Sequence, residues 1–187
     1  MIGISKLYCG AVEPGDVLRY ERGSGKLPSH LLQFSKDKKP VVVWNMTRRC
    51  NLRCVHCYSG SQDRPYTGEL TTAEAKAMIG DLAAFGSPVL LFSGGEPLMR
   101  PDLPELARYA VDRGMRAVIS TNGTLIDEAA AATFREIGLS YVGVSLDGME
   151  ATHDRFRGTP GAFAAAMRGI RICRDMGIKV GVRFTIH

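Results

Sequence analysis

The chain has 187 residues, of which 45% are hydrophobic and 23% charged, as is typical of a globular domain with a substantial core. No apolar run approaches the roughly 20 residues that span a bilayer, and residues 1–10 lack the apolar segment of a secretion signal, so we expect no membrane association. The net charge of +5 comes from dispersed basic residues without interleaved aromatics, so we expect no nucleic-acid partner.

Residues 1–40 differ from the rest of the chain. They are rich in glycine and proline and carry only a short apolar run at Leu31-Leu32. This composition predicts a loop-rich N-terminal arm over residues 1–40. The regular pattern begins at Val41 and continues to the end of the sequence, so residues 41–187 are expected to form the folded core.

From Val41 onward, short apolar runs alternate with amphipathic helical stretches. The predicted strands are Val41–Met46, Val89–Phe92, Arg116–Ser120, Tyr141–Leu146 and Lys179–Ile186. The predicted helices are Thr72–Phe85, Leu103–Arg113, Asp127–Ile137 and Ala162–Met176. Strand, helix and strand in repetition predict an α/β fold with a parallel sheet and right-handed crossovers, and the β-branched runs indicate strands buried on both faces.

Capping residues mark the ends of the predicted helices. Thr71 and Glu74 have capping-box spacing, and Asp102 with Pro104 suits the start of the second helix. Glycines that favour a left-handed cap follow the helices at Gly86, Gly114, Gly138 and Gly177. The sequence ends directly after a predicted strand that no helix covers, so we expect the chain to be a fragment of a longer protein.

Three of the five cysteines lie in one run, Cys50-Asn-Leu-Arg-Cys54-Val-His-Cys57, directly after the first predicted strand. Three thiolates on one tight loop favour a cubane iron–sulfur cluster whose fourth iron is open to another ligand. From the spacing alone, a zinc site that includes His56 or a redox pair of Cys54 and Cys57 stays an alternative. An odd cysteine count with three clustered residues indicates a reducing, cytoplasmic setting.

Polar, glycine-rich turns follow the other predicted strands. Since active sites of parallel α/β folds gather at the carboxyl ends of strands, we expect these turns and the cysteine loop to face one mouth. Glu96 offers an acceptor for an ammonium group, and Ser145 and Asp147 offer partners for ribose hydroxyls. This set suits a nucleoside that carries an amino acid. The turns are Ser93–Pro97, Ser120–Gly123, Ser145–Gly148 and Phe184–His187.

On these motifs, the chain resembles the radical S-adenosylmethionine (radical SAM) superfamily over residues 41–187. The spacing of the three cysteines matches the cluster motif of that superfamily, and Ser93-Gly-Gly-Glu-Pro97 matches its methionine-amine motif. The turns after the third and fourth strands resemble a subgroup that usually carries a C-terminal auxiliary-cluster domain. The resemblance implies a partial parallel (β/α) barrel of about five strands with outer helices, truncated before its last strand and before any auxiliary-cluster domain.

Three segments resemble the tetrapyrrole-processing branch: Ile4–Gly10, Pro28–Leu32 and Val42–Cys54. They are most similar to the AhbC-type 12,18-didecarboxysiroheme deacetylases of haem biosynthesis, which remove acetate side chains to give iron-coproporphyrin III. The NirJ-type enzymes, which act on the same precursor on the way to the haem of nitrite reductase, are similar too. One departure is His56, because the position before the third cysteine is often aromatic in the superfamily.

The resemblance also implies cofactors and partners. Cys50, Cys54 and Cys57 would bind a [4Fe–4S] cluster, and no side chain is assigned as a catalytic acid or base. A flavodoxin or ferredoxin would donate electrons, and the basic balance fits a carboxylate-rich tetrapyrrole. The residues implied to contact S-adenosylmethionine are Gly94, Gly95, Glu96 and Pro97 at the amine, Ser145 and Asp147 at the ribose, Arg157 at the carboxylate, and Asn122 as a further contact.

Two other hypotheses remain. A non-enzymatic iron–sulfur or zinc-binding module would explain the cysteines but would leave the Gly-Gly-Glu-Pro turn unexplained. A radical SAM enzyme that modifies a peptide or RNA would carry the same strand-end motifs, because those motifs serve the cofactor and not the substrate.

Overall fold

The structure is a computed structural model, and it describes residues 39–185. The chain divides into two compact units after Lys38, and all the described residues lie in the second unit, which begins at Lys39. Residues 1–38 of the predicted N-terminal arm lie outside the described residues, and so does Ile186 at the end of the predicted fifth strand. The outside part of the arm includes two of the segments that resemble tetrapyrrole-processing enzymes. The domain boundary at residue 40 therefore stays a prediction.

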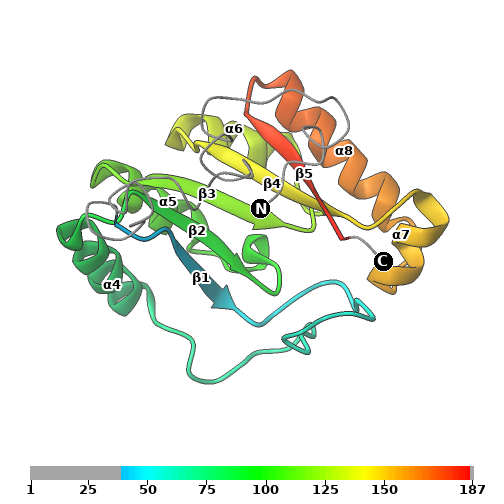
Figure 1. The fold of residues 1–187 in the computed structure, drawn as a ribbon, viewed down its shortest axis with the longest axis horizontal. Helices are drawn as coiled ribbons and strands as arrows, with labels where there is room; N and C mark the ends of the chain where they lie inside the picture. The colour runs from blue at the N-terminus through cyan, green and yellow to red at the C-terminus, as the bar shows by residue number, and fades with distance from the viewer. Residues whose placement is uncertain (1–38, 186–187) are drawn as a thin grey trace, which may run out of the picture. The chain divides into compact units, whose positions relative to one another are not determined.

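Five parallel strands form one sheet in the order β1-β2-β3-β4-β5, which confirms the predicted α/β fold (Figure 1). Each strand lies beside its sequential neighbour, as expected of a right-handed series of βαβ units. β1 shows a register irregularity between Asn45 and Thr47, where the chain leaves the sheet toward the cysteine loop. The strands are β1 (Val42–Thr47), β2 (Val89–Gly94), β3 (Arg116–Thr121), β4 (Tyr141–Leu146) and β5 (Val180–Phe184).

Helices connect the strands, and α4, α5, α6 and α8 pack against one another in that order (Figure 1). Among the helices of the described residues, none is both long and apolar enough to cross a membrane. The helices are α4 (Thr72–Phe85), α5 (Leu103–Asp112), α6 (Glu128–Ile137), α7 (Glu150–Arg157) and α8 (Ala162–Asp175), with a short 3-10 helix, η2 (Pro97–Met99).

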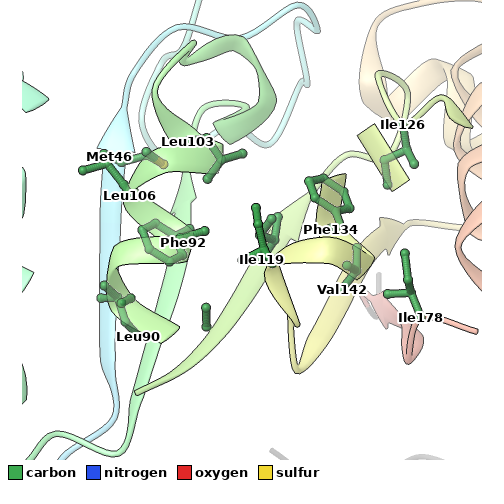
Figure 2. Packing of buried hydrophobic residues seen from close by; sticks show 14 of the residues in the cluster. Met46, Leu90, Phe92, Leu103, Leu106, Ile119, Ile126, Phe134, Val142 and Ile178 are labelled. Carbon is green, nitrogen blue, oxygen red and sulfur yellow. The ribbon is translucent and has the colours of Figure 1, made fainter. Parts of the chain in front are cut away.

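The core lies between the sheet and these helices (Figure 2). Alternate residues of the strands, such as Phe92 on β2 and Ile119 on β3, are fully buried against Leu106 of α5 and Phe134 of α6. The prediction of strands buried on both faces is wrong for β1 and β5, because Val43 is 57% and Val182 53% exposed. In the described part of the chain, the sheet is therefore apolar and packed mainly on its helical side.

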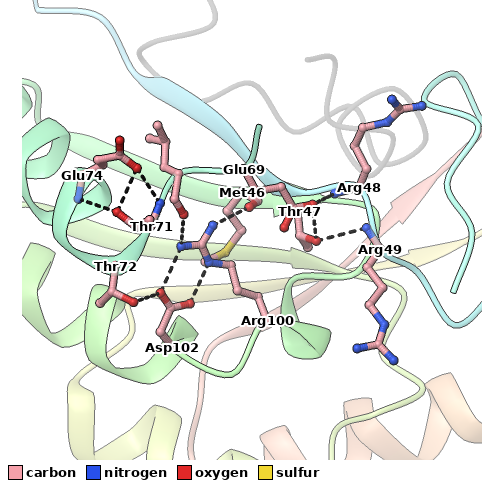
Figure 3. A network of polar contacts seen from close by, with 11 residues as sticks. Met46, Thr47, Arg48, Arg49, Glu69, Thr71, Thr72, Glu74, Arg100 and Asp102 are labelled. Atoms are coloured by element: carbon pink, nitrogen blue, oxygen red, sulfur yellow. Dashed lines mark hydrogen bonds and ion pairs between the residues drawn. The ribbon is translucent and has the colours of Figure 1, made fainter. Parts of the chain in front are cut away.

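The predicted helix starts are partly confirmed. The capping box of α4 is present, since Thr71 accepts a hydrogen bond from the Glu74 amide and the Glu74 carboxylate accepts one from the Thr71 amide (Figure 3). Asp102 makes no capping hydrogen bond to α5. Its carboxylate instead accepts hydrogen bonds from Arg100 Nε and the Thr72 hydroxyl, each at 2.7 Å (Figure 3).

Two short elements, α7 and η2, were not predicted. α7 has the sequence Glu-Ala-Thr-His-Asp-Arg-Phe-Arg, which carries no apolar stripe, and it buries His153 and Arg157 instead. A search for hydrophobic periodicity cannot find such a helix. Its available signal is charge, because Glu150 stands in the first turn while Arg155 and Arg157 stand in the last, which complements the helix dipole.

Candidate active site

The carboxyl ends of the strands surround a cavity of about 240 Å³. The structure thus brings the cysteine loop together with residues that follow or end β2, β3, β4 and β5. Glu96, Pro97 and Asp147 are buried beside this cavity but do not line it. The lining residues are Cys50, Leu52, Cys54, His56, Cys57, Tyr58, Ser59, Ser61, Ser93, Gly94, Gly95, Ser120, Thr121, Asn122, Ser145, Arg157 and Thr185.

The chain that leaves β1 is held in place by Glu69. The Glu69 carboxylate accepts hydrogen bonds from the Thr47 hydroxyl at 2.9 Å and from the Arg48 amide at 2.8 Å (Figure 3). The Thr47 hydroxyl in turn accepts one from the Arg49 amide at 3.0 Å. These contacts fix the direction in which the chain enters the cysteine loop.

The three thiols of the cysteine loop line the cavity and form no disulfide with one another. Within residues 39–185, no three His, Cys, Asp or Glu side chains converge closely enough to hold a single metal ion. Cys50 is buried, and its sulfur accepts hydrogen bonds from the Leu52 amide at 3.5 Å and from Asn122 Nδ2 at 3.9 Å. Soft sulfur donors surrounded by N–H groups suit an iron–sulfur cluster, so this donor set fits a cubane with three protein ligands.

The protonation of the thiols differs across the loop. Burial raises the pKa of the Cys50 thiol to about 11, and it also raises the pKa of Cys54. Partial burial acts in the same direction on Cys57, but contacts with Ser59 and Ser61 outweigh it and lower the pKa of that thiol to about 7. Because iron binds the thiolate, metal binding would displace protons from Cys50 and Cys54.

Gly94 and Gly95 allow the turn after β2 to lie directly on the chain that leaves β1. A Cβ atom on Gly94 would lie 2.2 Å from the Thr47 carbonyl oxygen, and one on Gly95 would lie 2.3 Å from the Arg49 carbonyl oxygen. The Gly95 amide donates to the Thr47 carbonyl at 2.7 Å, and the Glu96 amide donates to the Arg49 carbonyl at 2.8 Å. The two glycines therefore have a packing role whether or not a ligand also approaches them.

Glu96 is fully buried and joins the turn after β2 to the turn after β3. Its carboxylate accepts hydrogen bonds from the Thr121 hydroxyl at 2.7 Å, the Asn122 amide at 2.8 Å and the Leu98 amide at 3.1 Å. Burial raises its pKa to about 7 against these three hydrogen bonds, which act in the opposite direction. A carboxylate has about four acceptor sites, so one remains for a further donor such as an ammonium group.

Asn122 connects the turn after β3 to the cysteine loop. Its Nδ2 donates to Asn51 Oδ1 at 2.9 Å, and its Oδ1 accepts from the Thr124 amide at 2.9 Å. Asn51 Nδ2 donates to the Thr124 hydroxyl at 2.9 Å. This connecting role of Asn51 and Thr124 was missed from the sequence, because nothing in the spacing of Asn51 and Thr124 along the chain marks their contact.

Asp147, which lies behind the cavity, forms a buried ion pair with Arg157, which lines it. Arg157 Nε lies 2.7 Å from Asp147 Oδ2, yet its N–H does not point at that oxygen, and neither Asp147 oxygen has a hydrogen bond of good geometry among the described residues. His56 Nε2 lies 3.7 Å from the same oxygen. A buried carboxylate with acceptor sites to spare fits a polar ligand group, which accords with the predicted role of Asp147.

Arg157 also reaches the cysteine loop. Its Nη1 lies 3.7 Å from the Cys54 sulfur, and its carbonyl accepts a hydrogen bond from the Arg53 amide at 3.2 Å. The Phe156 carbonyl accepts from the Val55 amide at 2.8 Å. The C-terminal end of α7 is therefore fastened to the middle of the cysteine loop by two backbone hydrogen bonds and one guanidinium.

His153 supports the turn after β4 from α7. It is fully buried, and its Nδ1 accepts a hydrogen bond from the Asp147 amide at 3.2 Å. Burial, together with the Arg157 charge, lowers the pKa of His153, so the ring is neutral and carries its proton on Nε2. Ser145, at the end of β4, lines the cavity directly, whereas Asp147 lies behind it.

Comparison with known proteins places this site in a family. Residues 44–187 match the Radical SAM superfamily. The chain is 71% identical over its 187 residues to Fe-coproporphyrin III synthase of Methanosarcina barkeri, and 51% identical over 148 residues, 79% of the chain, to pre-heme d1 synthase of Dinoroseobacter shibae. It spans 47% and 37% of the lengths of these two relatives.

A solved structure shares the fold. Native anSMEcpe with bound AdoMet superposes with a TM-score of 0.64 at 22% identity, over 76% of this chain and 42% of that one. The fold, the match over residues 44–187 and the relatives agree with one another. The chain therefore belongs to the radical SAM superfamily of enzymes.

Proposed function

We propose that the protein to which this chain belongs removes acetate side chains from 12,18-didecarboxysiroheme to give iron-coproporphyrin III. The observation that carries this proposal is the 71% identity to Fe-coproporphyrin III synthase over the whole of the chain. The chain itself corresponds to about half of that relative, so the proposal concerns the longer protein and not the activity of these 187 residues alone.

The cofactors of this chain are those of its superfamily, a [4Fe–4S] cluster and S-adenosylmethionine. Cys50, Cys54 and Cys57 would hold three irons as thiolates, and S-adenosylmethionine would bind at the fourth. When bound, these cofactors would supply the radical chemistry that removes hydrogen from the substrate, by one-electron reductive cleavage of S-adenosylmethionine.

The described side chains would bind and orient S-adenosylmethionine. The remaining acceptor site of Glu96 and the backbone of Gly94 to Pro97 would receive its amine, while Ser145 and Asp147 would receive the ribose. Arg157 would receive the methionyl carboxylate, which is supported by its presence among the residues that line the cavity. Asn122 also lines the cavity, where it would contact the cofactor while it ties two loops together.

The partners of the longer protein follow from charge and from the chemistry of the reaction. A carboxylate-rich tetrapyrrole suits a chain with a net charge of +5. A flavodoxin or ferredoxin would supply the electrons. A cytoplasmic location, without membrane or nucleic-acid partners, stays a prediction from the sequence.

A second candidate is the pre-heme d1 synthase reaction of the NirJ-type enzymes. The 51% identity over 148 residues favours this candidate over peptide-modifying members of the superfamily. A non-enzymatic metal-binding module is disfavoured, because the chain belongs to an enzyme superfamily and the Gly-Gly-Glu-Pro turn has its place beside the cysteine loop.

An anaerobic assay distinguishes these functions. The longer protein would be incubated with reductant, S-adenosylmethionine and 12,18-didecarboxysiroheme, and the porphyrins would be resolved by chromatography and mass spectrometry. Loss of two acetate groups is expected from the longer protein and no turnover from the 187-residue chain. A product of different mass would favour the NirJ-type reaction, and no consumption of the tetrapyrrole would contradict both proposals.

A further inference from the structure

Two of the cysteine thiols face a second cavity as well as the first. Cys54 and Cys57 line both the cavity at the strand ends and an outer pocket of about 520 Å³. The two openings share only these thiols and Ser61. The cysteine loop therefore separates the inner cavity from the outer pocket, whose other lining residues are Arg53, Gly60, Gln62, Asp63 and Arg64.

At the outer pocket, the positive charge of Arg53 and Arg64 is not neutralised by any carboxylate of residues 39–185. Arg53 and Arg64 form no ion pair with a described residue, and the carboxylate among the lining residues, Asp63, is paired with Arg49 at 2.7 Å. Arg48 stands close by, since its Nη2 donates to the Ser59 carbonyl at 3.0 Å. Its guanidinium, like those of Arg53 and Arg64, forms no ion pair with an acidic side chain among the described residues.

Two of these arginines, Arg48 and Arg64, stack on one aromatic ring. The guanidinium carbons of Arg48 and Arg64 lie 4.6 and 4.7 Å from the centre of the Tyr66 ring. The Tyr66 hydroxyl accepts from the Gln62 amide at 3.1 Å and donates to the Gly60 carbonyl at 3.4 Å. Because stacking on an aromatic ring fixes a guanidinium without neutralising it, the surface keeps its charge available for a partner.

The electron required by the proposed reaction needs an entry other than the inner cavity. That cavity, at about 240 Å³, is where S-adenosylmethionine would bind, and a protein donor is far too large to enter it. An iron bound by Cys54 or Cys57 would be separated from the outer pocket only by the thiolate that binds it. A donor at the outer pocket would thus come close to the cluster without displacing the cofactor.

We propose that the outer pocket is the docking site of an acidic one-electron donor protein of the flavodoxin or ferredoxin class. Opposite charge guides such a donor to Arg48, Arg53 and Arg64, and one electron passes from the reduced donor to the oxidised cluster past Cys54 or Cys57. No bond forms or breaks, the donor is oxidised by one electron, and the cluster is reduced by one. This inference rests on the proposed function only in requiring a reducible cluster.

Charge reversal at the pocket tests the inference. Cluster-loaded chain carrying Arg53→Glu and Arg64→Glu would be titrated with oxidised flavodoxin by calorimetry at increasing sodium chloride. We expect the dissociation constant at low salt to rise roughly tenfold or more, and its salt dependence to flatten. The neutral pair Arg53→Gln and Arg64→Gln should give a smaller effect in the same direction, and it serves if the first variant fails to load its cluster.

A matched control lies on α8. Arg168→Glu with Arg171→Glu makes the same change in net charge at two exposed residues that form no ion pair with a described residue, far along the chain from the cysteine loop. We expect wild-type affinity for flavodoxin from this variant. Equal losses in the two double variants would show that only net charge matters, and unchanged affinity in the pocket variant would place the docking site elsewhere; either outcome overturns the proposal.

Reduction kinetics separate docking from chemistry. Stopped-flow bleaching of the cluster by reduced flavodoxin should slow in the pocket variant, whereas photoreduction by a small deazaflavin should not. A slowing with both reductants would mean that the substitutions disturb the cluster itself and would overturn the docking proposal. Neither measurement involves a tetrapyrrole, so a wrong substrate assignment would leave these results unchanged.

Discussion

A single buried carboxylate, that of Glu96, links two loops of the site and responds to pH. Burial raises its pKa to about 7 from 4.5, so the folded chain holds a proton that the unfolded chain releases between these values. The stability that protonation provides is present below pH 4.5 and is lost as the pH rises through 7. Relative to Glu96→Gln, the free energy of unfolding of the metal-free wild type should fall by about 3 kcal/mol at most from pH 4.5 to 8.

Urea denaturation at several pH values measures this difference. The comparison between wild type and Glu96→Gln removes the contribution of every other titrating group that the two share. Parallel pH profiles of the two proteins would show that Glu96 does not titrate with the shifted pKa.

The three loop cysteines are predicted to act together as cluster ligands. Replacing Cys50, Cys54 and Cys57 by alanine should abolish the bound iron and the visible absorption of the anaerobically reconstituted chain. Cys173→Ala is the control, because that thiol is buried on α8 outside the cysteine loop. Full iron content in the triple variant, or zinc alone in the wild type, would contradict the assignment.

Arg157 is predicted to stabilise the fold through Asp147. Arg157→Met would leave a fully buried carboxylate without its ion-pair partner, and loss of one partner of such a pair costs roughly 3–5 kcal/mol. Arg155→Met, two residues away on the exposed side of α7, should cost about 0.5 kcal/mol or less. Denaturant unfolding of the two variants measures both values, and equal small losses would mean that Asp147 needs no cation.

At the scale of elements, the C-terminal end of α7 holds the cysteine loop in place through backbone hydrogen bonds. Gly158, just after α7, has a φ of +64°, and a Cβ atom there would lie 2.3 Å from the Arg53 carbonyl oxygen. Gly158→Ala should therefore push α7 away from the loop and weaken the hydrogen bonds of the Arg53 and Val55 amides. Hydrogen exchange of these two amides should accelerate, and the chain should lose more stability than from the strained φ alone.

Gly161→Ala separates strain from contact. Gly161 has a similar φ of +79°, but no atom lies within 4 Å of the position of its Cβ. Both variants bear the cost of a left-handed conformation, about 1 kcal/mol, and only Gly158→Ala adds the collision. Unaltered exchange at Arg53 and Val55 in Gly158→Ala would show that the fastening is unimportant to the loop.

Elements with an apolar stripe could be predicted closely from the sequence. The bounds of α4 and β4 agree with those predicted, and within residues 39–185 the other predicted strands and helices differ by one or two residues at their ends. α7 could not be predicted in this way, because it packs through His153 and Arg157. Pairing of those side chains with the turn after β4 is visible only once the chain is folded.

The candidate site, too, could be predicted from the sequence only in part. The cysteine loop and the strand-end turns could be placed at one mouth, because parallel strands present their carboxyl ends on one side. The burial of Glu96 and Asp147 behind the cavity could not be predicted, since it depends on partners elsewhere in the chain. Thr121 and Asn122 donate hydrogen bonds to Glu96, and Arg157 of α7 forms an ion pair with Asp147.

For the whole molecule, the described core exposes apolar side chains on both outer strands. Val43 on β1 is 57% exposed, and Val182 and Phe184 on β5 are 53% and 48% exposed. Exposed apolar edge strands favour association with other chains. We expect the 187-residue chain, made alone, to self-associate at increasing concentration in sedimentation velocity experiments.

Lysine at these edges tests the cause of association. Val43→Lys with Val182→Lys should shift the chain toward monomer, because a charge on an edge strand opposes pairing. Val55→Lys, a substitution at a 71% exposed position on the cysteine loop, is the control for added charge. If all variants associate equally, another surface is responsible.

Three loops hold one another in a closed circuit. The chain that leaves β1 contacts the turn after β2, where the Gly95 amide donates to the Thr47 carbonyl. The turn after β2 contacts the turn after β3 through Glu96 and Thr121. The turn after β3 contacts the cysteine loop after β1 through Asn122 and Asn51. Such a circuit has a practical consequence for protein engineering. If the cysteine loop alone were transferred to a new scaffold, it would lose the hydrogen bonds that position it. If all three loops were transferred together, those hydrogen bonds would be kept.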